Sequence, residues 1–161
     1  MSYDAIEAAI KTILLYDTTT FPALVAPDTI SQVTRGDWRI MDSGKSPLVV
    51  LYAGGYTEDE SQIAALNEFA VTWTAKLDLI VKYTDDGATR TTLAQKRDVI
   101  LQDIMQYPML HGLASATARL GKITSDGDPV PIFDKNGGGP FFLMQTFSIP
   151  VSEVLAIAPL G

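Results

Sequence analysis

The clearest pattern along the chain is an alternation of side-chain character from Glu68 to Lys82. Every second residue is apolar and the residues between are mostly polar; the apolar row is Phe69, Val71, Trp73, Ala75, Leu77, Leu79, Val81 and Tyr83. Successive side chains of a strand point to opposite faces, so the pattern predicts one long strand with an apolar face and a polar face. At about 3.3 Å per residue it would reach roughly 50 Å, far beyond the usual ~17–20 Å. We expect this strand either to bend or to be completed in part by another chain.

Apolar residues recur at helical spacing on both sides of the long strand. The first helix is expected to end near Tyr16, with one apolar stripe formed by Tyr3, Ile6, Ile10, Ile13 and Leu14. The second is expected over residues 89–106, with a capping box at Thr92 and Gln95 and a stop at Pro108. Its apolar arc consists of Leu93, Ala94, Ile100, Leu101, Ile104 and Met105. Residues 85–87, Asp-Asp-Gly, are predicted to form the turn that reverses the chain before this helix.

The remaining elements are expected to be short. Residues 48–52 read as a buried strand closed by Gly54 and Gly55, residues 115–123 as a strand of small residues, and residues 141–151 as the last strand. Residues 18–46 are predicted to be irregular, with at most a helical turn over 28–33, and residues 124–140 to form a mobile loop. The order of elements favours a single α+β domain over residues 1–161. We expect an antiparallel sheet of about four strands with both helices packed on one face.

Composition narrows the classes of function. The chain has 161 residues and a formal net charge of −7, which argues against binding nucleic acid by neutralising phosphates. It has no cysteine, so disulfides and thiolate metal sites are excluded. The start of the chain, with Asp4 and Glu7, does not resemble a secretory signal, and no apolar run approaches the ~20 residues that span a bilayer. No membrane contact is expected.

Candidate catalytic groups are few. His111 is the only histidine, and its position between Pro108 and Gly112 favours a turn without a chemical role. Asp37 and Asp42 could be paired carboxylates, but both also suit turns, and the sequence supplies no accompanying base or nucleophile. We therefore predict no catalytic residue, no cofactor-binding residue and no metal ligand, and we expect that the protein is not an enzyme.

Five residues are candidates for contacts between subunits. Ile80 is the one large apolar residue on the polar face of the long strand, and Arg97 falls within the apolar arc of the second helix. Such an arginine either extends its head into water or meets a carboxylate, for example on a neighbouring subunit. Leu155 and Ile157 belong to an apolar C-terminal stretch that needs covering. Lys135 lies in the predicted mobile loop, which we expect a neighbouring subunit to order.

The layout resembles the tail terminator, or tail completion, proteins of long-tailed bacteriophages and prophages. The resemblance covers nearly the whole chain and rests on the order and character of its elements, which are the first helix, residues 36–39 (Gly-Asp-Trp-Arg), residues 47–52, residues 69–83, residues 89–106 and two closing strands. It implies a virion structural protein without catalysis, assembled in the host bacterial cytoplasm. Such proteins form a hexameric ring on the tail, end tail polymerisation and join a head–tail connector protein to the tail tube protein, while DNA passes through without specific binding. A neck or head-completion protein of the same virion, and a small cytosolic enzyme or ligand-binding domain using a cleft beside Asp37, Asp42 and His111, remain as alternatives.

Overall fold

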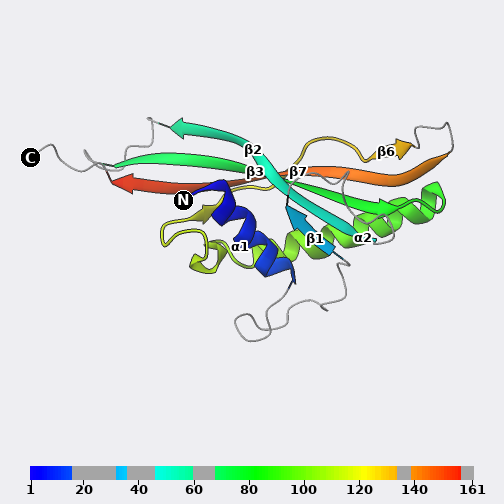
Figure 1. Cartoon of the computed structure of the whole chain (residues 1–161), viewed down its shortest axis with the longest axis horizontal. Helices are drawn as coiled ribbons and strands as arrows, with labels where there is room; N and C mark the ends of the chain where they lie inside the picture. The colour runs from blue at the N-terminus through cyan, green and yellow to red at the C-terminus, as the bar shows by residue number, and fades with distance from the viewer. Residues whose placement is uncertain (16–31, 36–45, 60–67, 134–138, 157–161) are drawn as a thin grey trace, which may run out of the picture.

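The computed structural model describes residues 1–15, 32–35, 46–59, 68–133 and 139–156. Within these ranges the chain forms two α-helices, one short 3₁₀ helix and seven strands of a single sheet (Figure 1). In chain order the elements are α1 (Tyr3–Leu15), β1 (Gln32–Arg35), β2 (Leu48–Asp59), β3 (Glu68–Lys82), α2 (Asp86–Met105), η4 (Leu110–Gly112), β4 (Arg119–Leu120), β5 (Thr124–Ser125), β6 (Val130–Phe133) and β7 (Pro140–Ala156).

The sheet is built around the pair of its two longest strands. Its order is β1-β2-β3-β7-β4, and the short strands β5 and β6 also pair with β7. The β1–β2 pair is parallel and the other pairs are antiparallel. Both helices lie on the same face of the sheet (Figure 1). The α+β class and the placement of the helices are therefore confirmed, whereas the expected count of about four strands is wrong.

The main core lies between the helices and the apolar row of β3. Leu77 and Leu79 are fully buried there against Ile10 of α1 and against Ile100 and Ile104 of α2. Because an antiparallel partner places directly opposite residues on the same face, β7 adds its own alternate row of Leu143, Phe147, Ile149 and Val151. The strand predicted from alternation is thus confirmed at the residues expected, and its apolar face is the one that the helices cover.

The structure extends β2 well beyond the glycines that were expected to end it. The register between β2 and β3 shifts by one residue between Ala53 and Gly55, so Gly54 sits in a β-bulge and the ladder continues to Asp59. A Cβ atom on Gly54 would lie 2.7 Å from the Thr74 carbonyl oxygen. The strand passes this point only because glycine has no side chain. The expected end at residue 52 was wrong for this reason.

Helix α2 begins earlier than the sequence pattern suggested. The side chain of Asp85 accepts a hydrogen bond from the Ala88 backbone N–H at 2.9 Å, so Asp85 is the N-cap and Asp86 and Gly87 are already helical. Arg90 lies one turn further on and forms an ion pair with Asp86 at 3.1 Å. The predicted turn at 85–87 and the predicted capping box at Thr92 were therefore wrong.

The predictions for residues 115–133 were also wrong, and residues 134–138 of the predicted loop lie outside the described residues. Only Arg119 and Leu120 of the expected strand over 115–123 form a ladder, and the expected mobile loop contains β5 and β6. The long edge of β7 supplies backbone partners to each of these short segments. Pro131 fits within β6 because an edge strand can leave one side of its backbone unpaired.

Residues 32–35 form strand β1 and not the helical turn that was considered for 28–33. β1 pairs in parallel with the start of β2, and Val33 is buried in the main core. Arg35 at its end bonds to Asp4 and, at 2.9 Å, to Glu7, so its charge is neutralised by two acids of α1. Tertiary contacts with β2 and α1 thus decide the conformation of a segment with little pattern of its own.

A second, smaller apolar cluster lies on the opposite face of the sheet and includes Ile80. Leu48, Val50 and Ile80 are buried, with Phe142 and Met144 packed around them. Ile80 is only 1% exposed because Leu48 lies directly opposite it on β2 and Met144 on β7. The expectation that Ile80 is available for a neighbouring subunit was wrong, since it contributes to the core of its own chain.

No helix in the described part of the chain is both long enough and apolar enough to cross a membrane.

Candidate functional site

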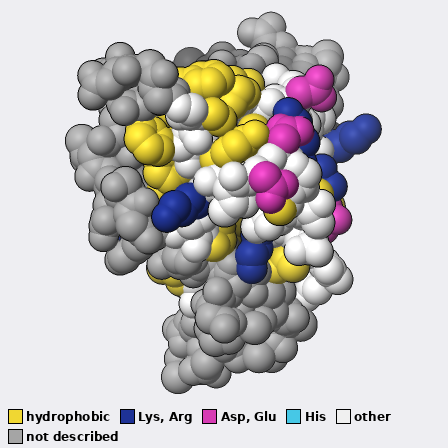
Figure 2. Space-filling model, turned by 90° about the vertical axis from the view of Figure 1, so that its right-hand side faces the viewer, with side chains coloured by type: hydrophobic (Ala, Val, Ile, Leu, Met, Phe, Trp, Pro, Cys, Tyr) yellow, Lys and Arg dark blue, Asp and Glu magenta, His cyan; other side chains and the backbone are white. Residues whose placement is uncertain are grey.

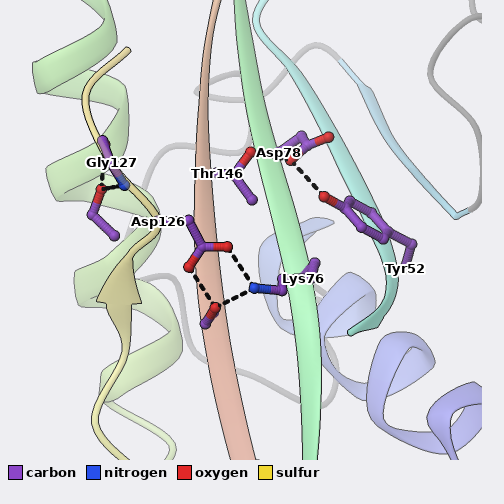
Figure 3. Close-up of polar contacts among 8 residues, drawn as sticks. Tyr52, Lys76, Asp78, Asp126, Gly127 and Thr146 are labelled. Carbon is purple, nitrogen blue, oxygen red and sulfur yellow. Dashed lines mark hydrogen bonds and ion pairs between the residues drawn. The ribbon is translucent and has the colours of Figure 1, made fainter. Parts of the chain in front are cut away.

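A buried carboxylate lies on the sheet face that the helices leave uncovered (Figure 3). Asp78 of β3 is 4% exposed and accepts hydrogen bonds from Thr146 Oγ1 at 2.7 Å and from Tyr52 Oη at 3.1 Å. Burial raises the pKa of Asp78, and the two hydroxyl donors oppose that rise. Burial, reinforced by the nearby Asp78 carboxylate, raises the pKa of Tyr52 to about 12. Tyr52 therefore acts as a hydrogen-bond donor at neutral pH, and Asp78, which accepts from both hydroxyls, joins β2, β3 and β7 at this level of the sheet.

A second polar group lies beside it and fixes the turn between β5 and β6. Lys76 Nζ lies 2.5 Å from Asp126 Oδ2 and 2.6 Å from Ser148 Oγ, and Ser148 Oγ donates to Asp126 Oδ1 at 2.5 Å (Figure 3). These bonds from Lys76 and Ser148 lower the pKa of Asp126. Gln145 Nε2 holds the same turn through Ser125 Oγ at 3.2 Å. The arrangement attaches the 125–128 segment to the sheet.

The chemistry of this face is that of a structural network. Each carboxylate accepts hydrogen bonds from side chains of its own fold, and Lys76 has both an acidic and a hydroxyl partner. A hollow of about 160 Å³ adjoins the network and is lined by Asp126, Gly127, Asp128, Val130, Met144 and Thr146. Among the residues that the structure describes, no group of three acids or histidines is placed to hold a metal ion.

His111 lies in the turn position that its neighbours predicted. It belongs to η4, where Leu110 and His111 have φ angles of 47° and 53°, and its ring meets Tyr107 edge-on at 5.7 Å. Left-handed backbone is costly for residues with a side chain, and the complete burial of Leu110 helps to hold it here. An apolar hollow runs past His111 along residues 106–112. Asp37 and Asp42, the other members of the considered cleft, lie outside the described residues.

The sheet is longer, along its strands, than the helices that cover one of its faces. β3 and β7 pair at every position from Glu68 opposite Ala156 to Lys82 opposite Phe142, without a register break. That ladder is roughly 50 Å long, whereas the 20 residues of α2 span about 30 Å. The ends of β2, β3 and β7 project to the left of α1 in Figure 1. We call residues 57–59, 68–72 and 152–156 the arm.

Two backbone edges of the arm have no strand partner among the described residues. β1 pairs with β2 only as far as Leu51, and β4 pairs with β7 only as far as Ser152. Within the described ranges the outer side of residues 52–59, which starts before the arm, and that of residues 153–156 are therefore unpaired, and we call them the open edges. Asp59 and Val154 stand at the same level, because both lie opposite Ala70 of the central strand. Near the base of the arm, the Met1 amino group lies 3.3 Å from the buried Glu153 carboxylate.

The opposite end of the molecule carries large exposed apolar side chains on the β6–β7 hairpin. Val130, Phe133 and Phe141 are each more than half exposed although they are large. Figure 2 looks at this end and shows hydrophobic side chains gathered in its upper part, with acidic and basic ones beside them. Val130 lies opposite Met144 on the face of Ile80, whereas Phe141 lies in the row of Leu143 on the helix face, so the exposed apolar side chains are spread over both faces of this end. The two ends of the sheet thus differ, one with open strand edges and the other with apolar side chains.

The structure places the five predicted contact residues in different settings. Ile80 is buried, as described above, and Arg97 is partly exposed on α2 with its guanidinium bonded to Asp98 of the same helix at 2.9 Å. The backbone of Leu155 belongs to β7 opposite Phe69, so the apolar C-terminal stretch begins as part of the sheet. Lys135 and Ile157 lie outside the described residues. Of the three candidates that the structure describes, Leu155 is the one whose backbone lies in the arm.

The sequence analysis missed the open edges. Short stretches of the sequence do favour strands at these edges. Tyr56 and Thr57 are residue types that are common in strands, and Val154 continues the alternation of β7. The two glycines before Tyr56 favour a strand end, so the continuation of β2 was not predicted. The apolar run after Glu153 was interpreted as a separate tail, so the continuation of β7 was not predicted either.

Comparison of the chain with known protein families and with curated proteins finds no match.

A buried acid on α2 gives the fold a measurable pH dependence. Burial raises the pKa of Asp103 to about 6, from an ordinary value of 3.8. Between those values the folded state binds more protons than the unfolded state, so the free energy of unfolding falls as pH rises from about 4 to 6. The shift corresponds to at most about 3 kcal/mol. We expect Asp103→Asn to raise the melting temperature at pH 7.5, by about 2–4 °C for each kcal/mol regained.

The control for this experiment is Asp98→Asn, which changes an exposed acid on the same helix. The gain from Asp103→Asn should shrink at pH 4.5, where the wild-type carboxyl is already largely protonated. An Asp103→Asn protein that melts at or below the wild-type temperature at pH 7.5 would show that its environment does not penalise the charge.

Proposed function

We propose that this protein is a structural subunit of a bacteriophage virion. In this proposal six copies of the chain form a ring on the end of the tail tube. The ring stops polymerisation of the tube and presents a surface to the head–tail connector. The protein is made in the host bacterial cytoplasm, ends in the virion tail and acts without catalysis. The observation that carries the proposal is the arm, because strand edges that lack a partner within the described residues are templates for pairing with another chain.

Two further observations support the proposal. If the strands run along the ring axis, the arm and the β6–β7 hairpin lie at opposite axial ends, where a terminator needs two different partners. The exposed apolar side chains of Val130, Phe133 and Phe141 suit one such partner. The net charge of −7 suits a ring whose channel lets DNA slide, because acidic surfaces do not retain phosphates.

The test uses tail tube protein from the same genome, polymerising in the presence or absence of this protein. We expect negative-stain images to show a ring at one end of each tube, and tube lengths that stop increasing once the protein is added. Tubes that keep growing and carry no ring would contradict the terminator function. Rings bound only to connector complexes would identify a neck protein instead.

A further inference from the structure

The two open edges of the arm are complementary to each other. Residues 52–59 of β2 and residues 153–156 of β7 each present unpaired backbone groups within the described part of the chain. They lie on opposite sides of the three-stranded arm and overlap in level, since Asp59 and Val154 flank Ala70. One chain therefore supplies both halves of a strand-to-strand contact.

The edges carry only part of the protection that usually prevents pairing. Natural sheets protect their edges with charged side chains, proline or bulges. β6, on the β7 side of the sheet, contains Pro131, and β2 carries its bulge at Gly54. After the bulge, residues 55–59 contain neither proline nor lysine, and the same is true of residues 153–156. Val154 is apolar and 42% exposed there. The protection that these edges do carry is acidic, from Glu58, Asp59 and Glu153, and neither edge has the proline found in β6.

Strand direction fixes how two copies can meet. β2 and β7 are both antiparallel to β3, so they run parallel to each other. Rotation about an axis along the strands keeps that direction and brings the β7 edge of one copy beside the β2 edge of the next. A two-fold axis perpendicular to the strands would instead pair β2 with β2, or β7 with β7, in antiparallel fashion. The two symmetries therefore predict different residue neighbours.

We infer that the β2 edge of each subunit pairs in parallel with the β7 edge of a second copy, so that the arms form a continuous sheet around the ring. This inference rests on the proposed function, of which it specifies the subunit contact. At equal level the overlap is two residues, Glu58 and Asp59 beside Glu153 and Val154, and an offset of two residues lengthens it to four. A backbone hydrogen bond contributes only about 1 kcal/mol net. Each contact is therefore weak alone, and closure of the ring, which uses every edge, stabilises the set.

The absence of cysteine makes disulfide trapping a clean test. We would compare the double variant Asp59→Cys/Val154→Cys with each single variant, under mild oxidation of the full chain. A second pair, Thr57→Cys/Val154→Cys, covers a register offset of two residues. In a parallel, head-to-tail ring, identical positions are three strands apart, roughly 14 Å, which is too far for a disulfide. We therefore expect a ladder of covalent oligomers from at least one double variant and monomers from both single variants.

Each other outcome overturns the inference. Covalent dimers from Asp59→Cys alone, or from Val154→Cys alone, would indicate an antiparallel two-fold contact. Monomers from all four variants would show that the edges do not meet. The capping assay with wild-type protein is scored separately: if tubes are capped but no ladder forms, the proposed function stands and the ring closes through another surface.

Discussion

Ile80→Lys should unfold the subunit or lower its melting temperature by roughly 10 °C or more. The side chain is 1% exposed, within a cluster that includes Leu48 and Val50, so a lysine there would be a buried charge. Its nearest acid on that face, Asp78, already accepts two hydrogen bonds. An unpaired buried charge typically costs about 3–5 kcal/mol, and each kcal/mol corresponds to about 2–4 °C for a chain of this size.

Ile80→Val is the matched control, because it removes one methylene and leaves the site apolar. We expect it to cost about 0.5–1.5 kcal/mol. Thermal melting followed by circular dichroism measures both variants. If Ile80→Lys melts within 2 °C or so of the wild type, the site is accessible, and Ile80 returns as a candidate for subunit contacts.

Gly54→Ala should destabilise the subunit, because the strand leaves no room for a side chain at this position. The new Cβ would lie 2.7 Å from the Thr74 carbonyl oxygen and 2.9 Å from Lys76 Cγ. The lysine stem can move, but the carbonyl is part of the β2–β3 ladder and cannot. Overpacking of this kind costs about 1–3 kcal/mol, so we expect the melting temperature to fall by several degrees.

The neighbouring glycine gives the control. A Cβ on Gly55 meets nothing within 4 Å, so Gly55→Ala should leave stability unchanged or raise it by about 0.4–1 kcal/mol through the unfolded state. Equal melting of the Gly54→Ala and Gly55→Ala proteins would show that the bulge relaxes freely. The close approach of β2 to Thr74 would then not constrain the sequence.

The sequence predicted the elements whose pattern is local. The alternation of β3 requires only knowledge of strand geometry, and the stripe of α1 requires only helical spacing. The predictions were wrong at element boundaries where the same residues suit two structures. Asp85-Asp86-Gly87 suits a turn as well as a helix start, and the N-cap hydrogen bond from the Ala88 N–H to Asp85 decides between them. Gly54-Gly55 suits the end of a strand as well as a bulge, and only the partner strand makes it a bulge.

Non-local contacts explain the remaining errors. β4, β5 and β6 are too short to show a pattern, and they exist because β7 offers them an edge. Ile80 looked isolated because its neighbours, Leu48 and Met144, come from other strands. The same holds for the candidate site. The projection of the arm depends on where the helices stop relative to the sheet, and the sequence did not reveal that relation.

The central ladder also sets the order in which the fold can be completed during synthesis. β3 is the middle of the sheet, yet its longest partner, β7, is the last strand of the described chain, so this ladder joins residues far apart in sequence. Folds dominated by such distant pairings fold slowly. Until β7 leaves the ribosome, one entire edge of β3 stays uncovered while its apolar row is already present. Nascent copies on one messenger RNA are therefore most exposed to wrong strand pairing just before residues 140–156 emerge.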